Sequence, residues 1–205
     1  MARQRSTPVT PEASVDVRRA VLDGALDIIA TEGAEAVSMR EVARRAGVSH
    51  QAPYHYFGDR AGIFAAISEE GFRAFTDAFR EALDQPGDVA ANCLRAYVSF
   101  AIEHKGHYRV MFRSDICGIE THELTMNAAD EAFLTLLDLA EAVDPQRDPS
   151  DAMALPVALW AQAHGLATLI IDSPLLAKLP PESNLDELIN KISQLTVWRK
   201  NDNQS

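Results

Sequence analysis

Apolar residues recur along this chain at intervals of three and four positions, and no segment shows sustained alternation of apolar and polar residues. Intervals of three and four place side chains on one face of an α-helix, whereas a half-buried β-strand needs a period of two. The pattern therefore predicts an all-α protein of about nine helices. They are expected over residues 15–32, 38–46, 49–57, 60–84, 88–104, 107–113, 120–143, 151–172 and 184–198.

The second and third of these helices are very short, and a glycine separates them. The second opens with Ser-Met-Arg-Glu, a capping box in which Ser38 accepts a backbone hydrogen bond and Glu41 reaches back. Gly47 ends this helix, and Ser49 is the expected N-cap of the third. Pro53 would then fall at the fourth residue of the third helix and strain its first turn. Two short helices joined by a glycine-containing turn predict a helix-turn-helix.

A helix-turn-helix that reads DNA must leave one face of its second helix unburied, so that side chains can reach base edges. Gln51 can pair with adenine, and the Ala52 methyl suits the methyl group of thymine. The tyrosine hydroxyls and the two helix N-termini can bind phosphate, and two arginines flank the site as charge anchors. The candidate DNA-binding residues are Ser38, Arg40, Ser49, His50, Gln51, Ala52, Tyr54, His55, Tyr56 and Arg60.

The charge of the chain is divided unevenly. The formal net charge is −11, yet residues 1–62 contain 8 Lys and Arg against 8 Asp and Glu. The remaining residues contain 11 and 22, so they carry the whole negative charge. A neutral front end with local arginines can meet a polyanion, while the acidic body is repelled by it.

The stretch GAEAVSMREVARRAGVSHQAPYHYFGDRAGIF resembles the DNA-binding segment of the TetR family of bacterial transcriptional regulators. The resemblance covers about residues 15–70 and rests on the Ser38 cap, Val42 and Ala43, the turn over residues 46–49, Tyr54, the Tyr56-Phe57 pair and the turn over residues 58–60. The position of Arg60 is more often Lys in that family, and that of His55 is variable. The resemblance implies a flexible tail over residues 1–14, a DNA-binding domain over 15–60 and a helical effector-binding and dimerisation domain over 61–205.

Within the second half, LWAQAHGLATLI resembles the Trp-His-Gly signature of one TetR subclass, and HKGHYRVMF resembles a segment of the same subclass. Trp160 and His164 share a helix face, either as a hydrogen-bonded core pair or as part of a ligand cavity. The candidate ligand-binding residues are Tyr97, Met111, Phe112, Phe133, Trp160 and His164. Because these residues include no spare cation, the expected effector is small, mostly apolar and neutral, and not strongly anionic.

Residues 152–171 form an uncharged run of 20 residues, long enough to span a bilayer. Pro156, Gln162 and His164 interrupt it, and aspartates flank it, so a core helix or a subunit interface is the better interpretation. We therefore expect no membrane association and a homodimer. The candidate interface residues are Ala158, Ala161, Gly165, Leu169, Leu188 and Ile192.

The sequence contains few features that would indicate another class of protein, such as an enzyme or a metalloprotein. The sequence contains no G-x-S-x-G, H-E-x-x-H or Walker motif, which argues against an enzyme. Cys93 and Cys117 have no metal or redox spacing and are expected to be reduced thiols, so no metal and no cofactor are expected. The N-terminus lacks the apolar region of a signal peptide, which predicts a cytoplasmic protein. We expect a ligand-responsive regulator that binds double-stranded operator DNA, a repressor by family habit. The alternative is a DNA-binding regulator without a small-molecule effector, which a solidly packed body would favour.

Overall fold

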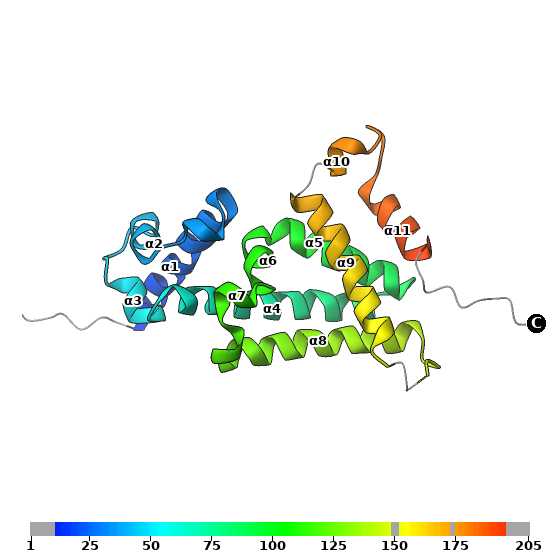
Figure 1. Ribbon diagram of the computed structural model, residues 1–205, viewed down its shortest axis with the longest axis horizontal. Helices are drawn as coiled ribbons and strands as arrows, with labels where there is room; N and C mark the ends of the chain where they lie inside the picture. Colours follow the sequence, from blue (N-terminus) through cyan, green and yellow to red (C-terminus); the bar gives the residue numbers. More distant parts are fainter. Residues whose placement is uncertain (1–10, 149–151, 173–174, 196–205) are drawn as a thin grey trace, which may run out of the picture.

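The computed structural model describes residues 11–148, 152–172 and 175–195, and every regular element in those ranges is helical (Figure 1). The predicted all-α fold is confirmed, because each of the nine expected helices has a counterpart. Two further helices of 4 residues each, α7 (Ser114–Cys117) and α10 (Leu175–Lys178), lie in segments too short to show a helical period. The expected helix ends at residues 151 and 196–198 fall outside the described residues.

Three helices form a small head at one end of the molecule (Figure 1). They are α1 (Pro11–Glu32), α2 (Met39–Arg45) and α3 (Ala52–Phe57), with a 3-10 turn over Ala34–Ala36 between the first two. The apolar stripe of α1, including Val21, Leu22 and Ile28, is fully buried. Gly24 allows a close approach of α2, because a Cβ there would lie 3.2 Å from the Ala46 backbone nitrogen. Residues 11–14 are helical, and the rest of the expected tail, residues 1–10, lies outside the described residues.

One long helix, α4 (Arg60–Asp84), contributes to two separate cores. Its first turns bury Ile63, Phe64 and Ile67 in the core of the head. Further along, Phe72 and Phe79 belong to the core of the body. A rigid helix shared by two cores can carry a displacement from one to the other.

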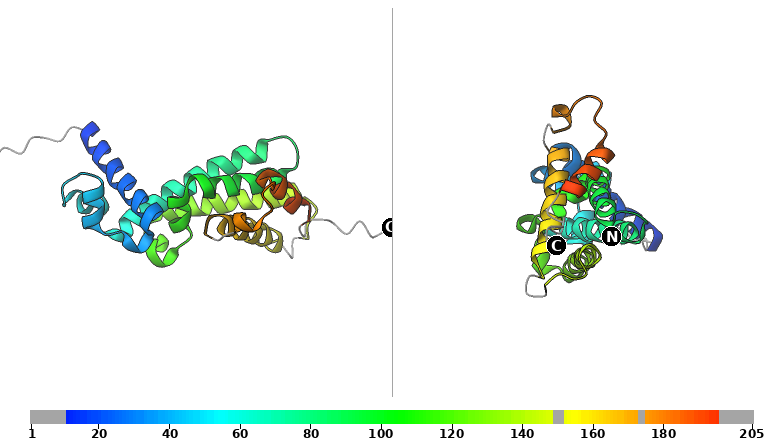
Figure 2. Two further views of the ribbon diagram at one scale, coloured as in Figure 1. Left: turned by 90° about the horizontal axis from the view of Figure 1, so that it is seen from above. Right: turned by 90° about the vertical axis from the view of Figure 1, so that its right-hand side faces the viewer.

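The body consists of α5 (Val89–Glu103), α6 (Lys105–Met111), α8 (Glu123–Val143), α9 (Ala154–Asp172) and α11 (Leu185–Leu195), with a 3-10 turn over Ile119–Thr121. Helix α8 lies beside α4, and α5 contacts α4, α9 and α11 (Figures 1 and 2). The Thr125 hydroxyl donates to the Ala65 carbonyl at 3.0 Å, which fixes the start of α8 on α4. The body core lies between these helices.

Helix α9 corresponds to the uncharged run. By length and composition it is long and apolar enough to cross a membrane. It packs instead against α5 and α8, with Leu159, Ala163 and Leu166 buried. Its opposite side carries Val157 and Leu169, which are 48% and 50% exposed. The helix therefore has one face in the core and one apolar face that no described residue covers.

Candidate functional site

The turn between α2 and α3 follows the predicted helix-turn-helix, with differences in the caps. The Ser38 hydroxyl accepts the Glu41 backbone N–H at 3.2 Å, as predicted. The second hydrogen bond of the predicted capping box, from Glu41 back to Ser38, is not formed. The Glu41 carboxylate instead accepts hydrogen bonds from Arg44. That hydrogen bond also lowers the pKa of Glu41. Gly47, with φ of 67°, takes the left-handed conformation that this turn requires.

Helix α3 begins later than predicted. Its N-cap is Gln51, without a side-chain hydrogen bond, so the predicted cap at Ser49 is wrong. Ser49 instead offers its backbone carbonyl to the Ala52 N–H at 3.0 Å. Pro53 consequently falls in the first turn, where its missing N–H has no intrahelical partner to lose, and the expected strain is absent.

The outer face of the head is formed by the residues around the start of α3. His50, Gln51, Tyr54 and His55 are exposed, while Ala52 and Tyr56 are half-buried. The His50 and Tyr54 rings lie 5.9 Å apart, as expected for residues on the same side of a helical turn. This face presents amide, imidazole and phenol groups to solvent, and an exposed glutamine amide can pair with a base edge.

The arginines of the head differ in how far they are engaged. Arg44 pairs with Glu41, and Arg45 pairs with Asp27 and Glu32. Arg40 is exposed and has no ion-pair partner among the described residues. Of the three described arginines of α2, it is therefore the one whose charge is most available to DNA.

The Arg60 side chain is engaged by contacts within the protein. Its guanidinium donates to the Ala34 carbonyl at 2.8 Å and lies over the Phe64 ring, 4.7 Å from the centroid. Its Nε is buried without an acceptor. Arg60 therefore ties the 3-10 turn to α4, and a phosphate would have to compete with these contacts.

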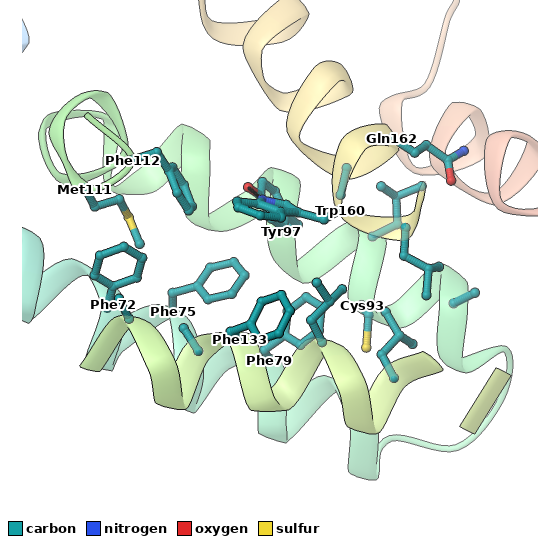
Figure 3. Close-up of a pocket in the computed structure, with 18 of the residues that line it drawn as sticks. Phe72, Phe75, Phe79, Cys93, Tyr97, Met111, Phe112, Phe133, Trp160 and Gln162 are labelled. Atoms are coloured by element: carbon teal, nitrogen blue, oxygen red, sulfur yellow. Dashed lines mark hydrogen bonds between the residues drawn. The ribbon is translucent and has the colours of Figure 1, made fainter. Parts of the chain in front are cut away.

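A cavity of about 350 Å³ lies in the body between α4, α5, α6, α8 and α9 (Figure 3). Five of the six candidate ligand-binding residues line it: Tyr97, Met111, Phe112, Phe133 and Trp160. His164 is not part of the wall. Sequence reasoning missed most of the wall, which includes Phe72, Phe75 and Phe79 of α4, Leu94 of α5, and Leu136 and Leu139 of α8. The three phenylalanines were visible in the sequence as an apolar stripe, which by itself predicts only core.

A hydrogen-bonded cluster closes one side of the cavity. The Trp160 indole N–H donates to the Tyr97 hydroxyl at 3.3 Å. That hydroxyl and the Tyr108 hydroxyl each lie 3.0 Å from His164 Nδ1. Burial lowers the pKa of His164, which favours a neutral ring whose Nδ1 can accept a hydrogen bond. Burial likewise raises the pKa of Tyr97 and keeps its hydroxyl protonated. Trp160 thus lines the cavity, while His164 packs behind it.

The candidate dimer residues lie on the uncovered side of α9 and on α11. Ala161 and Leu169 are exposed, and Ala158 and Gly165 are half-buried. A Cβ at Gly165 would have no atom within 4 Å, so this position faces open space in the protomer. On α11, Leu188 and Ile192 are half-buried, and α11 packs against α5.

Two family models match the chain. One, described as bacterial regulatory proteins of the tetR family, matches residues 21–67. The other, described as a tetracyclin repressor-like C-terminal domain, matches residues 90–192, half of the chain. Neither description names the Trp-His-Gly subclass, which stays a prediction.

Relatives and solved structures agree with these matches. The HTH-type transcriptional regulator BetI of Rhizobium meliloti is 33% identical over 104 residues, 51% of this chain and 46% of that protein. The HTH-type transcriptional repressor Rv3405c of Mycobacterium tuberculosis is 25% identical over 91% of this chain and 88% of its own length. A protein of unknown function from Rhodococcus sp. RHA1 has a similar structure, with a TM-score of 0.69, 26% identity, and coverage of 96% of this chain and 98% of that chain.

Proposed function

The chain belongs to the TetR family of bacterial transcriptional regulators, and from that membership we propose that it is a repressor controlled by a small molecule. Regulators of this family are DNA-binding transcription factors and not enzymes. In the proposal, a homodimer in the cytoplasm binds a palindromic operator, and a small, mostly apolar effector releases it. A repressor among the relatives supports the direction of control.

The exposed face around the start of α3 supports direct readout of DNA. Gln51 and His55 reach outward from it, and the unpaired charge of Arg40 lies on the neighbouring helix α2. In this division of roles, Gln51 and His55 select the base sequence, and Arg40 adds affinity for any phosphate backbone. Helix-turn-helix dimers bind half-sites one helical turn apart, so two-fold symmetry in the protein implies a near-palindromic operator.

The uncovered apolar side of α9 supports a homodimer. An exposed stripe that includes Val157 and Leu169 is unfavourable in water on a soluble monomer. Small residues between them, Ala161 and Gly165, leave room for a second helix to approach closely. We propose that α9 and α11 of two protomers pair across this surface.

The cavity supports control by a ligand over the effector-free alternative, which requires a solidly packed body. A volume of about 350 Å³ lies within the range of small-molecule sites. No lysine, arginine or histidine is among the described residues that line it, so a strongly anionic effector would lose its hydration without gaining a partner there.

The observation that carries the proposal is the union, in one chain, of the unburied α3 face and an apolar cavity whose wall includes α4. The test begins by selecting duplexes from a random pool with the purified protein. We expect a near-palindromic site. The neutral dye prodan should then bind the cavity with a blue-shifted emission and weaken binding of the selected duplex.

Matched variants on α8 decide whether the dye acts through the cavity. Ala132 lines the cavity, whereas Ala142 is exposed on the same helix. Ala132→Leu should fill space in the cavity and abolish both effects of the dye, and Ala142→Leu should preserve them. Undiminished dye response in Ala132→Leu would refute the effector role of the cavity and favour the effector-free regulator.

A further inference from the structure

Among the described residues that line the cavity, Asp130 is the one carboxylic acid, and no lysine or arginine accompanies it. It lies exposed on α8, between the wall residues Ala129 and Phe133, so this residue stands where the cavity meets solvent. Among the described residues it has no ion-pair partner, whereas the adjacent Glu131 pairs with Arg80 at 2.7 Å. The described wall thus carries one negative charge without an ion-pair partner, at the rim of the cavity.

The rest of the described wall is mostly apolar, and its polar groups include the Gln162 amide, which also has an interaction within the protein. The Trp160 N–H and the Tyr97 hydroxyl already bind within the protein, and the Ser193 hydroxyl donates to the Asn190 carbonyl at 2.9 Å. Burial raises the pKa of Cys93 to about 12, so its thiol is neutral. A ligand group inside the cavity therefore meets aromatic and aliphatic surface with its hydrogen-bonding groups engaged.

From the contrast between the apolar interior and the charged rim of the cavity, we propose that the effector is an amphiphilic cation. Its apolar body would lie inside the cavity, and its one positive charge would lie at Asp130. The inference rests on the proposed function, and it replaces the neutral effector expected from the sequence with a cationic one. Aromatic faces attract cations, and Phe133 and Trp160 belong to the same wall. The excess of 22 acidic over 11 basic residues beyond residue 62 also raises the local concentration of cations.

The experiment compares three probes that share a ten-carbon chain: decyltrimethylammonium, 1-decanol and decanoate. Binding to the full-length protein is measured by isothermal titration calorimetry, below the micelle-forming concentrations, at low and high salt. A partly exposed charge pair with a cation–π contact should make the cation bind about five- to tenfold more tightly than the alcohol. Decanoate should bind most weakly, and high salt should reduce the preference.

Variants at two aspartates of α8 localise the preference. Asp130→Asn should bring the cation and the alcohol to within about twofold of each other, and Asp130→Lys should favour decanoate. Asp138, exposed on the same helix and absent from the cavity wall, supplies the control, and Asp138→Asn should leave the preference unchanged.

The outcomes separate this inference from the proposed function. Equal affinities of the alcohol and the cation, or an unchanged preference in Asp130→Asn, would overturn the cationic effector while leaving the cavity as an effector site. Failure of all three probes to bind would overturn the effector cavity itself.

Discussion

Gly165→Leu tests the proposed dimer with little risk to the protomer. Because a Cβ at this position meets no atom within 4 Å, a leucine side chain should fit on the isolated protomer without a clash. Removing a glycine from the interior of α9 should even stabilise the helix, by about 0.5–1 kcal/mol. In a paired interface the same side chain overpacks, at a cost of about 1–3 kcal/mol per protomer. A two-fold axis repeats the change, so the dimer should lose about 2–6 kcal/mol.

That loss raises the dimer dissociation constant by roughly 30-fold to 20,000-fold, at tenfold per 1.4 kcal/mol. Sedimentation equilibrium over a range of protein concentrations measures it directly, and operator binding should weaken in parallel. Gly165→Ala is the matched control, since it brings the helix-forming gain with only one methyl group, and it should remain dimeric. A Gly165→Leu protein with the wild-type dissociation constant would place Gly165 outside the interface, and a monomeric wild type would refute the dimer.

Four further predictions concern the head and the cavity. Arg40→Ala should weaken binding to all DNA sequences alike and flatten the slope of log K against log salt by about one unit; an unchanged slope would remove Arg40 from the interface. Gln51→Ala should cost about 1–3 kcal/mol at one base pair and spare the others, and an equal loss on random DNA would contradict base readout. Phe112→Ala should alter the response to a cavity ligand and leave unliganded DNA binding intact; loss of both would make Phe112 ordinary core. Because the pKa of His164 is lowered on folding, unfolding free energy should fall as pH drops below about 6.5, by at most about 1.4 kcal/mol per unit. His164→Gln should remove that contribution, and an identical pH profile would exclude it.

The helices could be predicted from the sequence because apolar periodicity is a local property. The Ser38 cap was predictable for the same reason, since the Ser38 hydroxyl and the Glu41 N–H that donates to it are three residues apart. The cap at Ser49 failed because a serine before a helix can offer either its hydroxyl or its backbone carbonyl, and residue type does not distinguish them. Arg60 stays a predicted DNA contact, but its bond to the Ala34 carbonyl could not be predicted, because that carbonyl comes from a turn 26 residues earlier.

The cavity could be predicted only in part. Five wall residues were identified from aromatic or thioether chemistry and from a family signature, but the α4 phenylalanines have the same spacing as any buried stripe. Whether such a stripe meets other side chains or an empty space depends on how far neighbouring helices stand apart, which is a tertiary property. The position of Asp130 at the cavity rim could not be predicted for a related reason. The sequence does not show which exposed aspartate of a helix lies where a cavity opens.

Helix α6 shows why the path from effector to DNA also needed the structure. Its Met111 lines the cavity, while its Val110 is buried in the core of the head. Immediately before them, Arg109 donates to the Ile29 and Ala30 carbonyls near the end of α1. The same guanidinium pairs with Asp172 at the end of α9, at 3.0 Å.

A ligand that displaced α6 would therefore act on the head and on the proposed dimer helix through one short element, in addition to any tilt of α4. The close packing of Gly106 on α1, where a Cβ would lie 3.0 Å from a Leu26 methyl, leaves α6 little freedom to move without α1. Such a displacement changes DNA affinity only as far as the ligand binds one position of α6 better than the other. The differential contacts available for that choice are those of Met111 and Phe112, which are the only wall residues that α6 and its C-cap contribute.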